Sequence, residues 1–166
     1  MINNNMKKIV ILFISLAFLS CNGIAQKKDS TESVTYKVTK TDAEWKAQLT
    51  PLQYTVMRRE GTERQFSSEF NKNKRKGIYV CAACETPLFK SEHKYDSGSG
   101  WPSFDREIKG NVAFSTDRKI GYLRVEEHCA TCGGHLGHVF DDGPRNTTGK
   151  RHCVNGVALK FIESDE

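Results

Sequence analysis

Two Cys-x-x-Cys motifs constrain this chain more than any other feature of its sequence. The first holds Cys81 and Cys84, the second holds Cys129 and Cys132, and residues 85–128 separate them. Each motif places two thiolates close enough to bind one ion, and together they complete the tetrahedral set of sulfur ligands that suits Zn²⁺. We therefore expect one structural zinc ribbon per chain. Four thiolates close the shell, so this zinc would have no open position for a substrate.

Other uses of the paired cysteines remain open. A redox motif of thioredoxin type lies in a βαβ unit, which the pattern around these residues does not show. Paired disulfides stay possible because the chain is expected to be exported to an oxidising compartment.

The export signal lies at the amino terminus. Met6-Lys7-Lys8 is followed by an apolar run, residues 9–19, and then by small residues around Cys21. These are the parts of a secretory signal peptide. We expect residues 1–25 to be removed, or residues 1–20 if Cys21 is lipidated. Residues 26–39 would form a polar tether and residues 40–166 the folded domain, located in the bacterial periplasm or cell envelope.

Composition excludes several classes of protein. An apolar fraction of 37% with 10% aromatic residues is too high for a disordered chain. No apolar run is long enough to span a membrane, so a lipid on Cys21 would be the only membrane attachment. The net charge of +5 is small and includes Lys7 and Lys8 of the leader, which argues against a nucleic-acid partner.

Helices are expected first and strands afterwards. Thr41 with Glu44 forms a capping box, and Thr50-Pro51 begins a second helix that Gly61 would end. Short β-branched and aromatic runs then follow, separated by turn residues. The expected strands are 78–80, 112–114, 122–125 and 157–161. This order predicts a mainly β (α+β) fold of antiparallel sheets with short N-terminal helices.

The remaining cysteine, Cys153, has chemically suggestive neighbours. In a strand, Arg151, Cys153 and Asn155 would share one face. The arginine would then stabilise the nucleophilic thiolate, and Asn155 could hydrogen-bond a polar substrate group. A buried, inert cysteine is the alternative that position alone leaves open.

Two further segments carry candidate site residues. His135 and His138 lie in a glycine-rich stretch that ends at Asp141-Asp142, and histidine is the usual proton carrier near neutral pH. The loop of residues 95–104 offers Trp101, although a lone tryptophan is more often a core residue.

Together, four motifs resemble those of the type B methionine sulfoxide reductases over residues 40–163. They are the paired Cys-x-x-Cys, Ser-Gly-Ser-Gly-Trp-Pro-Ser-Phe, His-Leu-Gly-His-Val-Phe-Asp-Asp-Gly-Pro and Arg-His-Cys-Val-Asn-Gly. The resemblance implies a barrel-like arrangement of antiparallel sheets and a zinc far from the active site. It also implies reduction of the R epimer of methionine sulfoxide in oxidised proteins or peptides.

The resemblance implies a role for each site residue. Cys153 would attack the sulfoxide sulfur and become a sulfenic acid. His138, supported by His135, would protonate the sulfoxide oxygen, and Arg151 would lower the thiol pKa. The substrate pocket would be formed by Trp101 against the methyl group, with Phe140, Asp142 and Asn155.

One position departs from many members of that family. They carry a resolving cysteine where this chain has Ser99, and serine cannot form a disulfide with the sulfenic acid. An external thiol, from a thioredoxin-like partner or a small molecule, is therefore expected to reduce it. We expect a monomer. The alternatives are a zinc-ribbon binding module and a thiol-based redox sensor.

Overall fold

The computed structural model of the protein describes residues 35–164. The predicted signal peptide, Cys21 and most of the predicted tether lie outside the described residues. Within residues 35–164, no helix is both long and apolar enough to cross a membrane.

Two short helices open the described part of the chain, as predicted. Helix α2 (Asp42–Gln48) begins with a capping box between Thr41 and Glu44. Helix α3 (Pro51–Arg59) repeats the arrangement with Thr50 and Gln53, and Pro51 occupies its first turn. Each box pairs backbone N–H groups that a helix start leaves without partners.

Nine strands and three short 3₁₀ helices follow in residues 35–164. The strands are β1 (Gly77–Cys81), β2 (Pro87–Lys90), β3 (Lys94–Tyr95), β4 (Ser103–Phe104), β5 (Val112–Asp117), β6 (Arg124–Cys129), β7 (His135–Phe140), β8 (Arg151–Val154) and β9 (Leu159–Glu163). The 3₁₀ helices are η1 (Glu69–Lys72), η2 (Ser91–His93) and η3 (Gly156–Ala158).

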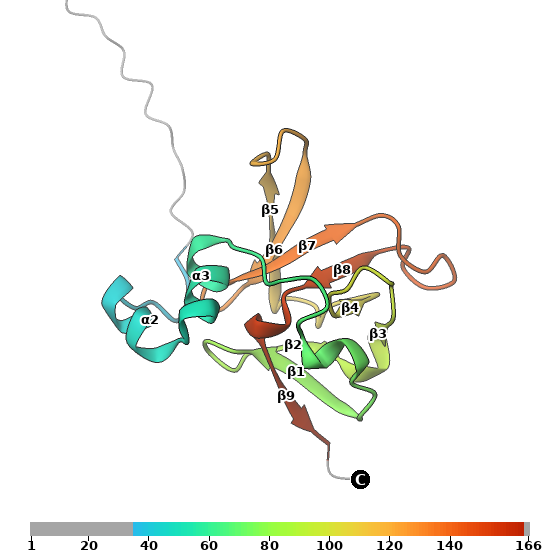
Figure 1. Cartoon of the computed structure of the whole chain (residues 1–166), viewed down its shortest axis with the longest axis horizontal. Coiled ribbons are helices and arrows are strands. Elements are labelled where there is room, and N and C mark those ends of the chain that lie inside the picture. The colour runs from blue at the N-terminus through green and yellow to red at the C-terminus, as the bar shows by residue number, and fades with distance from the viewer. Residues whose placement is uncertain (1–34, 165–166) are drawn as a thin grey trace, which may run out of the picture. The chain divides into compact units, whose positions relative to one another are not determined.

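The strands form two antiparallel sheets. The smaller has the order β2-β1-β9 and the larger has the order β3-β4-β8-β7-β6-β5. Each order runs between two edge strands, so the sheets of the described residues stay open and form no closed barrel. The mainly β, antiparallel fold is confirmed, with α2 and α3 on one side and the β5–β6 hairpin projecting from the body (Figure 1).

Two strand predictions are wrong at their edges. Tyr122 and Leu123 were expected in a strand, but β6 begins at Arg124 and both side chains are exposed in the turn before it. Residues 157–161 were expected to be extended throughout, but η3 occupies Gly156–Ala158 before β9 begins. In both places a turn takes residues of high β propensity, because tertiary context overrides that propensity.

An aromatic stack joins the two sheets. Tyr79 of β1 and Phe89 of β2 come from the small sheet, and Phe104 of β4 comes from the large one. Ring centroids lie 5.0 Å apart for Tyr79 and Phe104 and 4.4 Å apart for Phe89 and Phe104. All three side chains are fully buried. This core fixes β4, and through β4 it fixes β8, the strand that carries Cys153.

Candidate active site and metal centre

The four paired cysteines converge as the sequence predicts. Their Sγ atoms all lie within 4.8 Å of one another, and three of the four residues are buried. Cys81 and Cys132 are 3.7 Å apart at Sγ, and Cys84 and Cys129 are 3.5 Å apart. A disulfide needs about 2.05 Å, whereas sulfurs at about 2.3 Å around one Zn²⁺ lie about 3.8 Å apart. The cluster can therefore hold a metal ion with tetrahedral sulfur geometry.

The two motifs form the same turn. In each, the residue four places after the first cysteine donates its N–H to that cysteine's carbonyl oxygen: Glu85 to Cys81 and Gly133 to Cys129, both at 2.8 Å. Both residues have positive φ, 60° and 68°. Such a backbone favours glycine, which the second turn has and the first lacks.

Residues predicted as tether pack on the second motif. Val38 N–H donates to the carbonyl oxygen of Thr131, and the ring of Tyr36 lies 6.1 Å from that of His128. A Cβ on Gly133 would meet the Tyr36 ring at 2.4 Å. Tyr36 and Val38, which precede Lys40, therefore already pack on the second motif.

A row of side chains crosses four strands of the large sheet. Glu126 of β6 pairs with His138 of β7, His138 pairs with Cys153 of β8, and Cys153 pairs with Ser103 of β4. Directly opposed residues of an antiparallel pair project from the same face. Strand pairing thus sets the two predicted catalytic residues, Cys153 and His138, side by side.

Gly137 allows these strands to approach. A Cβ at this position would lie 2.0 Å from the carbonyl oxygen of Cys153, well inside any normal contact. The absence of a side chain at Gly137 therefore sets the spacing of β7 and β8 beside Cys153.

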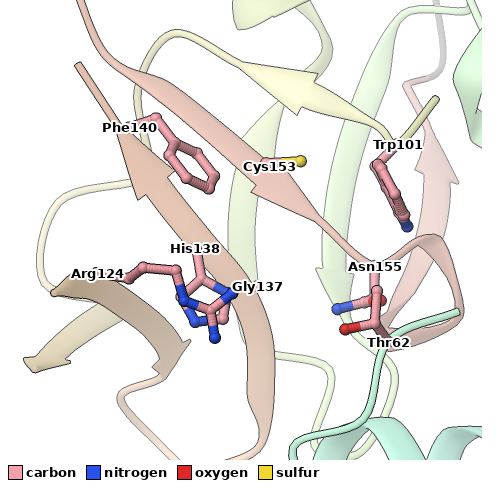
Figure 2. Close-up of a pocket in the computed structure, with 8 residues that line it drawn as sticks. All are labelled: Thr62, Trp101, Arg124, Gly137, His138, Phe140, Cys153 and Asn155. Carbon is pink, nitrogen blue, oxygen red and sulfur yellow. The ribbon is translucent and has the colours of Figure 1, made fainter. Parts of the chain in front are cut away.

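A pocket of about 140 Å³ opens at this row (Figure 2). Five of the predicted site residues line this pocket, and three further lining residues were not anticipated. The lining residues are Thr62, Trp101, Arg124, Gly137, His138, Phe140, Cys153 and Asn155. The Cys153 sulfur points from β8 toward the side where Trp101 lies (Figure 2).

Asn155 supports the pocket through the backbone. Its Oδ1 accepts a hydrogen bond from Glu63 N–H at 2.9 Å, and its Nδ2 donates to the Leu136 carbonyl at 2.9 Å. Trp101 Nε1 donates to the Glu63 carbonyl at 3.3 Å. Asn155 and Trp101 are thus joined through Glu63, whose buried carboxylate also accepts from the N–H groups of Gly156 and Val157.

Burial and the neighbouring polar groups shift the pKa of Cys153 in opposite directions. Burial raises the pKa of the Cys153 thiol above its usual value, while a hydrogen bond to Ser99 and the charge of Arg151 lower it. The two atoms, Ser99 Oγ and Cys153 Sγ, are 3.8 Å apart. Ser99 is itself held by Ser97, which also contacts Ser103 at 2.7 Å. Arg151 acts in the predicted direction, but burial outweighs it.

Arg151 and Asp142 form a bidentate pair beside the pocket rather than in its lining. Arg151 Nε and Nη2 lie 2.8 and 2.9 Å from the two carboxylate oxygens of Asp142. The guanidinium also stacks 4.4 Å from the Phe140 ring centroid. The hydrogen bonds lower the pKa of Asp142, so the pair stays charged.

His138 contacts a carboxylate that comes from the β5–β6 hairpin. His138 Nε2 lies 2.7 Å from Asp117 Oδ2. Arg124 also donates to Asp117 Oδ2, and Lys119 N–H donates to Asp117 Oδ1 at 2.7 Å. These donors lower the pKa of Asp117 to about 2, so it is ionised at neutral pH. Burial lowers the pKa of His138, and the Asp117 hydrogen bond opposes that shift.

His135 lies behind His138 and outside the pocket lining. It is almost fully buried, its ring centroid is 5.5 Å from that of His138, and its Nδ1 lies 2.7 Å from Glu126 Oε1. His135 lowers the pKa of Glu126 to about 2 chiefly by hydrogen bonding, against the effect of burial. His152 of β8 and Glu127 of β6 form a second buried pair, with His152 Nδ1 2.6 Å from Glu127 Oε2.

Comparison with known proteins decides the family. The model of the SelR domain matches residues 49–163. The chain belongs to the SelR family. A peptide methionine sulfoxide reductase MsrB of Leptospira interrogans is 54% identical over 127 residues, covering 76% of this chain and 96% of the relative. A protein of the same name from Chromohalobacter salexigens is 49% identical over 126 residues, covering 75% and 95%.

A mammalian relative is similar over a comparable share of the chain. The mouse methionine-R-sulfoxide reductase B3, mitochondrial, is 51% identical over 130 residues, covering 78% of this chain and 51% of the relative. Among solved structures, the Mis18 "Yippee-like" domain is similar with a TM-score of 0.45 and 13% identity, over 55% of this chain and all of that chain. That value is too low to bear on fold or function.

The residues that sequence reasoning missed in this SelR domain are Asp117, Arg124, Thr62, Glu63 and Gly137. Asp117 and Arg124 lie at the ends of strands that were placed only approximately, and antiparallel pairing brings them to His138. Glu63 follows α3, with no nearby motif to mark it. Asp117 lies beyond the expected strand 112–114, and no local signal in the sequence marks it.

Proposed function

We propose that this member of the SelR family is a peptide-methionine (R)-S-oxide reductase, which reduces methionine-R-sulfoxide in proteins or peptides to methionine. One observation supports it most: Cys153 and His138 are paired across β7 and β8 in one small pocket that Trp101 bounds. This arrangement sets a sulfur nucleophile beside an acid, at a site large enough for one side chain. Relatives named as such reductases align over most of the chain.

The chemistry follows from these two residues. The Cys153 thiolate attacks the sulfoxide sulfur while His138 gives a proton to the sulfoxide oxygen, which is otherwise a poor leaving group. The oxygen is transferred to Cys153, the substrate leaves as the methionine sulfide, and Cys153 becomes a sulfenic acid. Sulfur of the substrate is reduced by two electrons and sulfur of Cys153 is oxidised by two.

Asp117 and His135 position the acid. The Asp117 carboxylate favours the imidazolium form of His138, against a site whose burial favours the neutral ring. His135, fixed by Glu126, packs against the His138 ring. Both are positioning residues for His138.

The substrate side chain is held by apolar contact. Trp101 and Phe140 line the pocket and offer rings to the methyl group and to the side-chain methylenes. Asn155 shapes the pocket because its side chain forms hydrogen bonds with the backbone of Glu63 and Leu136. Asp142 shapes it by fixing Arg151 beside Phe140.

An external thiol recycles the enzyme. Ser99 lies 3.8 Å from Cys153 and has no thiol to offer, and the other four cysteines of residues 35–164 belong to the metal cluster. One thiol attacks the sulfenic acid and releases water, giving a mixed disulfide, and a second thiol restores Cys153 and leaves as part of a disulfide. A thioredoxin-like protein or a small thiol can supply both equivalents.

Zinc is the metal that suits the quartet. Cys81, Cys84, Cys129 and Cys132 would hold it, and four thiolates supply structural stabilisation rather than catalysis. The protein is further proposed to be an exported monomer, lipid-anchored at Cys21 or cleaved after Ala25. Mass spectrometry of the mature N-terminus distinguishes these two forms.

An assay of both sulfoxide epimers tests the function. Purified protein with dithiothreitol is expected to reduce the R epimer of N-acetyl-methionine sulfoxide and to leave the S epimer unchanged. Thioredoxin with its reductase is then compared with dithiothreitol as the reductant. Absence of R-epimer turnover with either reductant would contradict the proposal and favour a binding module or a thiol sensor.

A further inference from the structure

Exposed apolar side chains gather on the hairpin that serves the pocket. In residues 35–164, five large apolar residues with exposed side chains lie on or between β5 and β6, and three lie elsewhere. The hairpin residues are Phe114, Ile120, Tyr122, Leu123 and Val125. The residues at the tip, Ile120, Tyr122 and Leu123, are 54%, 59% and 60% exposed, and we call them the tip patch. A cluster of this kind on a polar surface is typical of an interaction site.

The tip patch is connected to the pocket through Asp117. One carboxylate oxygen of Asp117 accepts from Lys119 N–H inside the turn, and the other contacts His138 in the pocket. Arg124, which follows the tip patch directly, lines the pocket. Lys119 reaches back to Glu60, two residues before the lining residue Thr62. The turn that carries the tip patch is therefore anchored at the edge of the pocket.

The size of the pocket requires such a surface. Its volume of about 140 Å³ is well below the roughly 300–1,000 Å³ of sites that enclose a drug-sized ligand. One methionine sulfoxide side chain can enter, so the residues on either side of it in a polypeptide must lie on the rim. The tip patch offers that rim apolar contact.

We infer that the tip patch binds the polypeptide segment flanking the oxidised methionine, and that it selects segments with apolar residues next to the sulfoxide. This inference rests on the proposed reductase activity. It assigns to the β5–β6 hairpin a part in substrate choice that is separate from the chemistry at Cys153. A second copy of the chain or a lipid surface is the competing occupant of such a patch.

The test compares a small substrate with peptides. The variant Ile120→Ser/Tyr122→Ser/Leu123→Ser changes only exposed turn residues, which leaves folding nearly unaffected. Its kcat/KM is measured on N-acetyl-methionine-R-sulfoxide and on two eleven-residue peptides with one central methionine-R-sulfoxide, flanked by Leu and Val or by Gly and Ser. Dithiothreitol is the reductant throughout.

The wild-type protein is expected to favour the Leu/Val peptide about tenfold through KM, and the triple variant to lose that preference. Turnover of N-acetyl-methionine-R-sulfoxide should stay within twofold. The control variant Leu52→Ser/Ile162→Ser removes apolar side chains of similar exposure, 47% and 54%, on α3 and β9, and should keep the preference.

Several results would overturn the inference. They are an unchanged peptide preference in the triple variant, an equal loss on the small substrate and the peptides, and a wild-type dimer that the triple variant converts to monomer. Binding of the wild type, but not the variant, to phosphatidylglycerol vesicles with no peptide preference would assign the patch to a membrane instead. If the wild type fails on N-acetyl-methionine-R-sulfoxide as well, the proposed activity itself is wrong.

Discussion

The cysteine quartet and Cys153 place the same side chain in two opposite settings. The quartet surrounds each thiol with three others within 4.8 Å and buries most of them. Cys153 has as neighbours a hydroxyl, a guanidinium and an imidazole, and it opens on a pocket. In the quartet every sulfur has a use within the fold, whereas at Cys153 the sulfur is available to a molecule from outside.

The difference shows that the pKa of a cysteine depends on both its neighbours and its burial, and that a different one of the two dominates in each setting. Mutual hydrogen bonding within the quartet lowers the pKa of Cys84 and Cys129 and raises that of Cys81 and Cys132, as expected where close thiols share protons. At Cys153 burial raises the pKa of the thiol, and the Ser99 hydrogen bond and the charge of Arg151 only partly oppose it. Stability and reactivity are thereby assigned to separate cysteines of one domain.

The largest expected effect is on folding, and it follows from a substitution in the quartet but not from one at Cys153. Cys129→Ser removes one of four metal ligands, and structural zinc typically contributes about 10 kcal/mol or more. We expect the variant to lose its bound zinc and its cooperative unfolding transition, measured by elemental analysis and circular dichroism. A folded variant with the wild-type Tm and no metal would show that the quartet is not a structural metal site.

Cys153→Ser should have the converse effect. We expect turnover of methionine-R-sulfoxide to fall at least about a thousandfold, because serine is a far weaker nucleophile. Zinc content and Tm should remain those of the wild type, since Cys153 lies outside the quartet. Residual activity within tenfold of the wild type would exclude Cys153 as the nucleophile.

Asp117→Asn tests the acid beside Cys153. The Asp117 hydrogen bond raises the pKa of His138 against the effect of burial, so its loss leaves the ring neutral at lower pH. We expect kcat/KM to fall about 10- to 100-fold at pH 7.5 and less at pH 5.5, where more His138 is protonated. NMR titration of His138 should show the lowered pKa. Asp141→Asn, an exposed neighbour of Lys150, is the matched control and should change neither quantity.

The same substitution has a signature in stability. The pKa of Asp117 is about 2 in the folded protein, below the roughly 3.9 of an unfolded aspartate. The folded state therefore holds fewer protons, and this stabilisation is complete above about pH 4 and is lost as pH falls toward 2. Asp117→Asn should show a smaller loss of stability across that interval in urea unfolding.

Ser99→Ala should alter the reactivity of Cys153 without affecting the quartet. The Ser99 hydrogen bond lowers the pKa of Cys153, so its removal should raise that pKa further. We expect iodoacetamide to alkylate Cys153 about threefold more slowly at pH 7.5, as for the loss of one hydrogen bond. Alkylation rates in 6 M guanidinium should match, and a faster native rate in the variant would contradict the assigned direction.

The two turns of the quartet allow a contrast in stability, because both have a residue with positive φ. Glu85 adopts a φ of 60° that costs a non-glycine residue about 1 kcal/mol, and its exposed ion pair with Lys160 offsets only part of this. Glu85→Gly should therefore raise the free energy of unfolding by about 0.5 kcal/mol. Gly133→Ala should lower it by about 1–3 kcal/mol, because a Cβ there meets the Tyr36 ring. Urea unfolding of both variants measures the contrast.

Local signals in the sequence predicted the metal cluster, the helix starts and the face that Cys153 shares with Arg151. Each depends on residues a few positions apart, such as Thr41 with Glu44 or Cys81 with Cys84. Asp117 and Glu63 could not be found in this way, because the partners that give them meaning, His138 and Asn155, come from strands and turns far along the chain. The direction of the Cys153 pKa shift could not be predicted from the sequence either, since it depends on burial that only the packed fold determines.

Gly137 has a practical consequence for anyone who wishes to redesign the substrate range of this enzyme. Because a Cβ at this position would lie 2.0 Å from the Cys153 carbonyl oxygen, any side chain placed there would spread β7 and β8 and separate the proposed nucleophile from the proposed acid. A mutant library should therefore keep position 137 fixed and vary Thr62, a lining position outside the contacts of Cys153, His138 and Asp117. Variation at Thr62 can reshape the pocket while β7 and β8 keep their spacing.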